Sequence, residues 1–323
     1  MRFHGLLVVR DEADVIAQSV RHALAWADAI YAYDTGSTDG TWEILEQMAR
    51  ADERLVLYRR EPVYFRNDLR AVLFNRYRNR AERGDWFATV DADEFYHIAQ
   101  PRFVQTHLRT HETAVCYQLY DFKLTREECS CLESGQAIYR ERERPIEDRR
   151  RHFVCLRYGE PRLFRYRPTM QWVPPKAPYN LGYMASERIP IRHYSSRDPL
   201  QLAQKYRLRL RMRPFVGFEA SPHWQVTDWR SLLVNESAAD LNYWQPGAEL
   251  PAYRWTNHLA SPAKRCLQRA VHFGLLPILD RLRPRFPADY RPEPIPPEVD
   301  RQLRCASSGS IPDEADARTA FSS

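Results

Sequence analysis

Three carboxylates, those of Asp91, Asp93 and Glu94, lie within four positions directly after the apolar run 86–90. Like charges this close repel one another, and burying them unpaired is costly, so the cluster needs a counter-charge. Mg²⁺ and Mn²⁺ suit carboxylate oxygens and keep open positions for phosphate oxygens. The cluster therefore predicts a site where a divalent ion, held by Asp91 and Asp93, binds a diphosphate.

The first 95 residues predict the elements that position this cluster. Four apolar runs, rich in β-branched and aromatic residues, alternate with segments of helical periodicity. The strands are 3–9, 29–33, 55–58 and 86–90, and the helices are 13–26, 41–50 and one that begins at Asn67 or Asp68. Short, regular alternation of this kind predicts an α/β fold, a Rossmann-like and mostly parallel sheet flanked by helices. Asp11 and Asp39 are expected to cap the first two helices.

Polar residues stand at the carboxyl ends of these strands or in the first turn of the next helix. Because those positions share one edge of a parallel sheet, and ligands bind along that edge, we expect the side chains to meet there. They are Arg10, Glu12, Asp34, Arg70, Asp91 and Asp93. The sequence has no GxGxxG after the first strand and no GxxxxGK[ST], which excludes the two common phosphate-binding loops. A nucleotide bound by carboxylates and a metal ion remains.

Three segments, in this order and each at a strand end, resemble a family 2-type glycosyltransferase of the GT-A fold. They are Val9-Arg10-Asp11-Glu12, Asp34-Thr35-Gly36-Ser37-Thr38-Asp39-Gly40-Thr41 and the DxD motif Asp91-Ala92-Asp93-Glu94. The resemblance covers residues 5–95. It implies that Asp34 contacts the base or ribose of a nucleotide, that Asp91 holds the ribose or metal, and that Asp93 binds the metal. Arg10, Glu12 and Arg70 would line the nucleoside pocket.

The resemblance also implies a reaction. A sugar would move from a nucleotide diphosphate sugar, for which we expect a UDP-sugar, to a hydroxyl of a glycan or lipid-linked saccharide, with inversion and with Mn²⁺ or Mg²⁺. His193 would complete the metal shell, unless it is a hydrogen-bonded structural histidine. Arg192, Arg197 and Lys205 are candidate diphosphate contacts. Asp121, at the end of the predicted strand 114–122, is the preferred catalytic base among Asp121, Glu127, Glu128 and Glu133.

Two regions beyond residue 95 leave alternatives open. The charge-dense stretch 133–152 predicts a mobile solvated loop, or else a lid that orders over the sugar donor. Trp172 lies near several prolines and is expected either to pack in the core or to form an aromatic wall for a sugar ring.

The chain divides by motif and composition into three parts. Residues 1–110 are predicted to form the nucleotide-sugar half of the GT-A domain and 111–235 the acceptor half. Residues 236–323 form a mainly helical and irregular C-terminal extension with a disordered tail. Within it, the basic amphipathic segment 264–282 is expected to pack against the domain or to lie on an anionic membrane.

Bulk composition narrows the class of protein. No run of 18 apolar residues occurs, and the six cysteines have neither disulfide-framework nor zinc spacing, so we expect a cytoplasmic protein, at most peripheral at the inner membrane face. Of the 48 basic residues only four are lysines, and arginine suits phosphate-bearing ligands. Acidic residues are interleaved almost everywhere, which disfavours nucleic-acid binding. A non-catalytic protein that binds a nucleotide sugar or glycan is the alternative to an enzyme.

Overall fold

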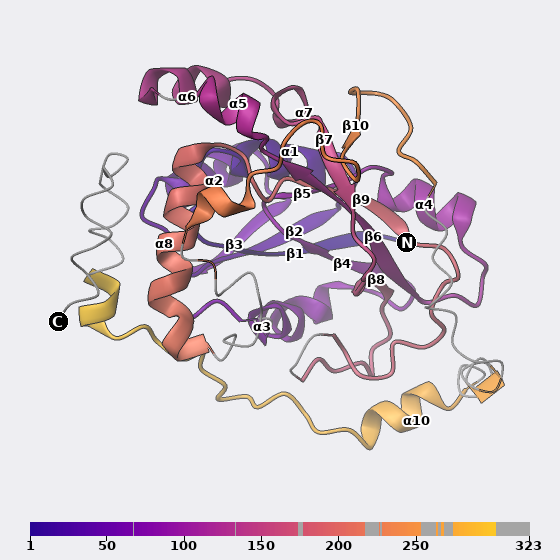
Figure 1. Cartoon of the computed structure of the whole chain (residues 1–323). Helices are drawn as coiled ribbons and strands as arrows, with labels where there is room; N and C mark the ends of the chain where they lie inside the picture. Colours follow the sequence, from indigo (N-terminus) through magenta and orange to yellow (C-terminus); the bar gives the residue numbers. More distant parts are fainter. Residues whose placement is uncertain are drawn as a thin grey trace.

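A computed structural model describes residues 1–66, 68–132, 134–173, 177–216, 226, 228–252, 263, 266–267 and 274–301. Figure 1 shows a central twisted sheet with helices on both sides. The N-terminal half contains β1 (Phe3–Val9), α1 (Ile16–Leu24), β2 (Ala29–Asp34), α2 (Thr41–Ala51), β3 (Leu55–Arg60), α3 (Asp68–Tyr77), the 3-10 helix η1 (Arg78–Arg80) and β4 (Trp86–Val90). The expected α/β alternation is confirmed.

The remaining described elements extend this sheet and cover it. They are β5 (Glu94–Tyr96), α4 (Gln100–His107), β6 (Ala114–Lys123), α5 (Arg126–Ser130), α6 (Gly135–Arg142), α7 (Ile146–Arg149), β7 (His152–Cys155), β8 (Pro161–Arg165), β9 (Ile189–His193), α8 (Pro199–Val216), η3 (Trp229–Leu232), β10 (Asn242–Tyr243) and α10 (Leu276–Arg281).

The strand pairing has a parallel half and a mixed half. Strand β1 pairs in parallel with β2 and β4, and β2 pairs in parallel with β3. Antiparallel β8 then joins β4 to β6. The long strand β6 continues past β8 to pair with β7 and, in parallel, with β9, which in turn pairs with β5. As a result, β6 carries residues from the sheet centre to the edge where β4 and β9 end.

Side-chain alternation along β1 divides the core into two layers. Leu7 and Val9 pack on the face covered by α1 and α2, while Leu6 and Val8 pack on the face covered by α3 (Figure 1). Successive side chains of a strand point to opposite faces, so a strand that is apolar throughout must be covered on both. All seven residues of β1 are buried. The continuous apolar run thus places β1 at the centre of the sheet.

The first predicted helix cap is wrong. Helix α1 begins at Ile16 rather than near residue 13, and Asp11 instead accepts a hydrogen bond from the amide of Thr38 at 2.7 Å. Asp39 accepts from the amide of Thr41 at 3.0 Å, where α2 begins. A loop aspartate can bond any amide in reach. Asp11 lies five residues before α1, and the adjacent turn supplies a nearer donor for it than its own helix.

Trp172 packs in the core, as the first of its two alternatives predicted. Its side chain is fully buried, and its ring lies 6.0 Å from that of Phe74 and 5.8 Å from that of Phe164. The wall for a sugar ring is therefore excluded at this position. The neighbouring prolines 174 and 175 lie outside the described residues.

The C-terminal extension is described only in part. Of segment 264–282 the structure covers 266–267 and 274–282, with α10 as its helix, and residues 302–323 lie outside the described residues. Across the described residues, none of the helices combines the length and apolar character that crossing a membrane requires.

Candidate active site

The carboxyl ends of β1, β2 and β4 and the end of β9 bring their polar residues to one edge of the sheet. Asp34 ends β2, Asp91 and Asp93 follow β4, and His193 ends β9. In the pairing register His193 lies opposite Glu94 on β5 and opposite Asp121 on β6. The topology therefore delivers residues from distant parts of the sequence to one cluster.

Asp91 is held between two arginines. Arg70 donates to its Oδ1, and Arg162 Nη1 lies 3.1 Å from its Oδ2. Burial opposes ionisation of Asp91, but the two guanidinium charges outweigh it and lower its pKa. Arg162 also donates to Glu94 Oε1 at 2.8 Å, while burial raises the pKa of Glu94 to about 7. Both oxygens of Asp91 are thus engaged within the protein.

Three cationic side chains lie within 4 Å of one oxygen of Asp93, its Oδ2. Its Oδ2 accepts from Lys205 Nζ at 3.2 Å and lies 3.4 Å from His193 Nε2 and 3.9 Å from Arg197 Nη1. Burial opposes ionisation here too, but the nearby cations hold the pKa of Asp93 well below its usual range. The arrangement concentrates negative charge at a point that three cationic groups surround.

His193 bridges the two carboxylates of the cluster. Its Nδ1 lies 3.0 Å from Asp121 Oδ1, on the opposite side of the ring from Asp93. Burial alone would lower the pKa of His193, but Asp93 and Asp121 raise it to about 10. Asp121 also accepts from Ser195 Oγ at 2.7 Å and from Lys123, and these neighbours lower its pKa despite its burial. A carboxylate with both oxygens committed in this way is a weak base.

Glu12 belongs to an adjacent buried network rather than to an open pocket. Arg197 donates to Glu12 and, at 2.7 and 2.9 Å, to both oxygens of Asp14. Burial, opposed by Arg197, raises the pKa of Glu12 to about 7, whereas Arg197 outweighs burial at Asp14 and lowers its pKa. Arg197 therefore links this network to Asp93.

Asp34 and Arg10 shape the turn after β2. Asp34 Oδ1 accepts from the amides of Gly36 and Ser37, at 2.8 and 2.6 Å. Its Oδ2 is buried and has no hydrogen-bond partner within the described part of the chain. Arg10 Nη1 donates to the carbonyl of Thr35 at 2.7 Å. An unpaired buried carboxylate oxygen is costly, and it is a natural acceptor for a donor group of a bound nucleotide.

Arg192 is not brought to the cluster. It precedes His193 on β9, so its side chain points to the opposite face, where it donates to Glu147 at 2.7 Å and covers the ring of Trp244. Lys205, in the second turn of α8, does reach the cluster. The other predicted site residues lie along the edge just described. They are Arg10, Glu12, Asp34, Arg70, Asp91, Asp93 and His193, with Asp121 beneath His193.

The expected mobile loop at 133–152 is wrong over the part that is described. Residues 135–142 and 146–149 are helical, and Arg149 and Arg150 are almost fully buried. Arg142 donates to Asp198 through two nitrogens at 2.9 Å, and Arg149 Nη2 lies 3.4 Å from the same carboxylate. Buried aspartates on other segments thus neutralise charges that the sequence alone placed in solvent.

Sequence reasoning missed three residues of the cluster: Asp14, Lys123 and Arg162. Asp14 sits two positions after Glu12, and Lys123 two after Asp121 on the same face of β6, so local spacing could have found both. Arg162 lies on β8, whose antiparallel insertion between β4 and β6 has no local signal. The match between Arg162 and Asp91 follows only from tertiary pairing.

The cluster was tested against the divalent ion that the resemblance implies. Asp93 Oδ2 and His193 Nε2 lie 3.4 Å apart. A carboxylate oxygen suits both Mn²⁺ and Mg²⁺, whereas an imidazole nitrogen suits transition-metal ions rather than Mg²⁺, so this pair favours Mn²⁺. Within the described ranges, no group of three His, Cys, Asp or Glu side chains is arranged to hold an ion. Mg²⁺ is usually held by one or two carboxylates together with phosphates and waters, so two protein ligands and a diphosphate suffice.

Comparison with known proteins defines the family. The family described as "Glycosyl transferase family 2" matches residues 6–168, half of the chain, and the chain belongs to this family. The resemblance given by the three motifs is therefore confirmed. No curated protein matches the sequence.

Two solved structures are similar over part of the chain. A mannosyltransferase from Pyrobaculum calidifontis, solved with GDP-Man and Mn²⁺, shares 15% identity over 51% of this chain and 44% of its own, with a TM-score of 0.30. A mannose-6-phosphate isomerase from Helicobacter pylori shares 8% identity over 38% of this chain and 51% of its own, with a TM-score of 0.26. The chain thus spans about half the length of each, and at these scores neither likeness bears on substrate.

Proposed function

We propose that this glycosyltransferase moves a sugar from a UDP-sugar to a hydroxyl of a glycan or lipid-linked saccharide, with a divalent ion and with inversion. The observation that carries the proposal is the convergence of Asp93 and His193 on one point at the sheet edge, beside Asp34 and Asp91. Ligands of α/β proteins bind at this edge, and the family supplies the reaction type.

Asp93 and His193 would hold the ion, with the diphosphate and water as its remaining ligands. When bound, the ion would neutralise charge that develops on the departing nucleoside diphosphate. His193 can bind a metal only as the neutral ring, so metal binding would expel the proton that Asp93 and Asp121 now stabilise. Asp91 could act as the predicted second ligand only if Arg70 or Arg162 released its carboxylate.

The other residues of the cluster have separate roles in the proposal. Lys205, with Nζ 3.2 Å from Asp93 Oδ2, would turn to the diphosphate as the ion takes its place, while Arg197 would stay paired with Asp14 beside the site. Asp34, through its unpaired Oδ2, and the Asp91–Arg70 pair would bind the nucleoside. Asp121 was predicted to be the base, but its contacts with His193 and Lys123 favour a role in orienting His193.

The competing function is a degenerate transferase that binds a nucleotide sugar or glycan without turnover. The intact Asp34, Asp91 and Asp93 argue against a protein that binds only a glycan, since such a protein would need none of them, whereas a nucleotide-sugar binder would keep them. Slow hydrolysis of the donor in the presence of Mn²⁺, compared with donor alone, separates the two readings. Turnover that tracks the purified protein supports the enzyme.

Thermal unfolding with a panel of nucleotide sugars tests the proposal. A ligand that binds only the folded state raises the melting temperature by mass action, and at 100 times its Kd it adds about 2.7 kcal/mol. We expect UDP-sugars with Mn²⁺ to raise the melting temperature by several degrees, and either component alone to raise it less. If neither UDP- nor GDP-sugars shift it with Mn²⁺ present, the proposed donor class is wrong.

A further inference from the structure

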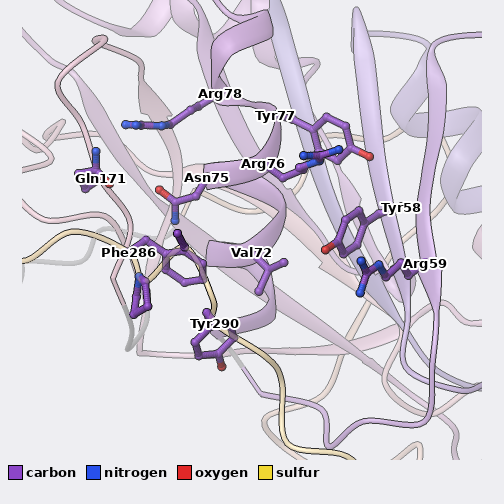
Figure 2. A pocket seen from close by; sticks show the side chains of 12 residues that line it. Tyr58, Arg59, Val72, Asn75, Arg76, Tyr77, Arg78, Gln171, Phe286 and Tyr290 are labelled. Carbon is purple, nitrogen blue, oxygen red and sulfur yellow. The ribbon is translucent and has the colours of Figure 1, made fainter.

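A hollow lies away from the cluster, between α3, the end of β3 and the C-terminal segment 286–290 (Figure 2). Its volume is about 560 Å³, within the usual size range of small-molecule sites. No residue of the active-site cluster lines it. The lining residues are Tyr58, Arg59, Val72, Asn75, Arg76, Tyr77, Arg78, Gln171, Phe286, Pro287, Ala288 and Tyr290.

The lining is basic, with three arginines and no aspartate or glutamate. Arg76 is exposed and makes neither an ion pair nor a hydrogen bond to any part of the chain that the structure describes. Arg59 lies 3.9 Å from Glu61, an exposed pair of the kind that contributes little. Arg78 donates to the carbonyl of Met170 at 2.5 Å, which fixes its side chain. Arg76 is therefore available to an anion, and Arg59 is held only by its exposed pair with Glu61 and by the ring of Tyr58, whose centroid lies 5.1 Å from Arg59 Cζ.

Aromatic rings form two opposite parts of the lining. Tyr58 and Tyr77, with ring centroids 6.2 Å apart, lie on the side of the sheet, and Phe286 and Tyr290, 4.9 Å apart, lie on the C-terminal segment (Figure 2). Rings of this kind pack against the apolar faces of sugars, while their edges and hydroxyls remain polar. A ligand that has sugar rings and also carries a negative charge would match this lining.

The C-terminal segment that closes the hollow is attached to the domain. Tyr290 donates to Asp68 at the start of α3, and Ile295 N donates to the carbonyl of Pro62 at 2.8 Å. Arg66 and Glu293 form an ion pair at 2.5 Å. These contacts hold Phe286 and Tyr290 against α3, so the hollow is preformed by parts of the chain more than 200 residues apart.

We propose that this hollow binds an anionic saccharide, whose sugar rings lie against the tyrosines and whose carboxylate or phosphate pairs with Arg59 and Arg76. The proposal rests on the proposed function, because a saccharide acceptor or product gives such a site its ligand. Helix α3 connects the hollow to the cluster, since Arg70 and Arg76 are about 9 Å apart along its axis. The site would hold a charged stretch of the glycan near the reacting end.

Direct binding tests the proposal without donor. The probes for isothermal titration are hexagalacturonate, a hexasaccharide phosphate, neutral maltohexaose and a polynucleotide, at low and moderate salt. We expect the wild-type protein to bind at least one anionic probe about tenfold or more tightly than maltohexaose. The Arg59→Gln/Arg76→Gln variant should lose that preference. The matched control, Arg21→Gln/Arg50→Gln, removes two exposed arginines from α1 and α2 and should keep it.

Three outcomes would overturn the site: no anionic saccharide bound by the wild-type protein, equal affinity in the Arg59/Arg76 variant, or a polynucleotide bound more tightly than every saccharide. The comparison of uronate with sugar phosphate identifies which anion is recognised. Thermal shift with UDP-sugar and Mn²⁺ on the same samples separates this test from that of the proposed function. If UDP-sugar with Mn²⁺ does not raise the melting temperature but the anionic saccharide still binds, only the proposed function is rejected.

Discussion

Arg197 donates hydrogen bonds to both carboxylate oxygens of Asp14, from Nε at 2.7 Å and from Nη2 at 2.9 Å. No part of the Arg197 side chain is exposed. The pair joins residues 183 positions apart and fixes the start of α8 against the segment before α1. Because Lys205 extends from α8 to Asp93, the pair also determines where that lysine lies. The geometry of the cluster thus depends on a buried ion pair beside it.

The first prediction concerns this pair. Asp14→Ala leaves the buried Arg197 charge short of a partner, and breaking a buried pair from one side typically costs about 3–5 kcal/mol. Urea unfolding should show this loss. Asp52→Ala is the matched control, since its pair with Arg54 is partly exposed and should cost about 1 kcal/mol or less. Equal, small losses in both variants would contradict the structural role of the pair.

The second prediction concerns the pH dependence of stability at His22. Burial, with Arg192 nearby, lowers the pKa of His22 to about 4, while Nε2 bonds the carbonyl of Tyr96 at 2.9 Å. The unfolded chain, with an ordinary histidine pKa, binds the proton first as pH falls. The contribution of His22 is therefore complete above pH 6.5 and declines between 6.5 and 4, by about 2 kcal/mol at pH 5.

His22→Gln tests this sign. The difference in free energy of unfolding between wild-type and variant, measured by urea at pH 7.5 and at pH 5, should shrink by about 2 kcal/mol at the lower pH. Other titrating groups contribute equally to both proteins and cancel. A difference that stays constant or grows on acidification would show that His22 is not held neutral in the fold.

The sequence predicted the first four strands and the edge where they end, because local apolar runs and turn residues determine both. Strand β4 begins and ends at the predicted residues 86 and 90. The carboxylates after it were found for the same reason. What local patterns could not show is which cations neutralise them, since Arg162, Arg197 and Lys205 reach Asp91 and Asp93 from β8 and α8.

The same limit explains the two failures of prediction at charged positions. Arg149 and Arg150 look like solvated residues in the sequence, and they are buried because Asp14, Asp198 and Glu141 come to them from other segments. Arg192 was selected for its neighbour His193, although adjacent residues of a strand face opposite ways. The charge of a residue and its proximity in sequence to a site residue do not by themselves show which way its side chain points or whether it is buried.

The third prediction separates two roles for Asp121. If it orients His193 toward a bound ion, Asp121→Asn should weaken Mn²⁺ binding by about 10- to 100-fold, as outer-shell substitutions do. Isothermal titration with Mn²⁺ in the presence of UDP-sugar measures this. Unchanged Mn²⁺ affinity, with transfer slowed by about 10²- to 10⁴-fold, would instead identify Asp121 as the base. Ser195→Ala removes only its hydroxyl partner and serves as the control.

The fourth prediction is that segment 264–282 contacts an anionic membrane. Asp280 is buried and pairs with Arg167 at 2.5 and 2.7 Å, so α10 is attached by one face. Leu275 and Leu282, which flank the helix, and Ile278 within it are 48%, 75% and 53% exposed, beside the exposed Arg281. Apolar and basic side chains on one surface suit an anionic bilayer.

Cosedimentation with vesicles measures this contact. Vesicles of phosphatidylglycerol in phosphatidylcholine should bind the wild-type protein at least tenfold better than phosphatidylcholine alone. Changing the three exposed apolar residues of the α10 region to serine should remove most of that binding. Tyr139→Ser, at an equally exposed position on α6, is the control. If all three proteins bind the phosphatidylglycerol vesicles equally, α10 does not contact the membrane and only packs against the domain.

The central claim is that Asp93 anchors an ion that binds the donor diphosphate, and Asp93→Asn tests it most directly. The measurement is the affinity for UDP-sugar with and without Mn²⁺, with Asp52→Asn as a control for loss of an exposed carboxylate. We expect Mn²⁺ to strengthen donor binding in the wild-type and control proteins and to have no effect in Asp93→Asn, while the variant stays folded. An undiminished Mn²⁺ effect in folded Asp93→Asn would contradict the account.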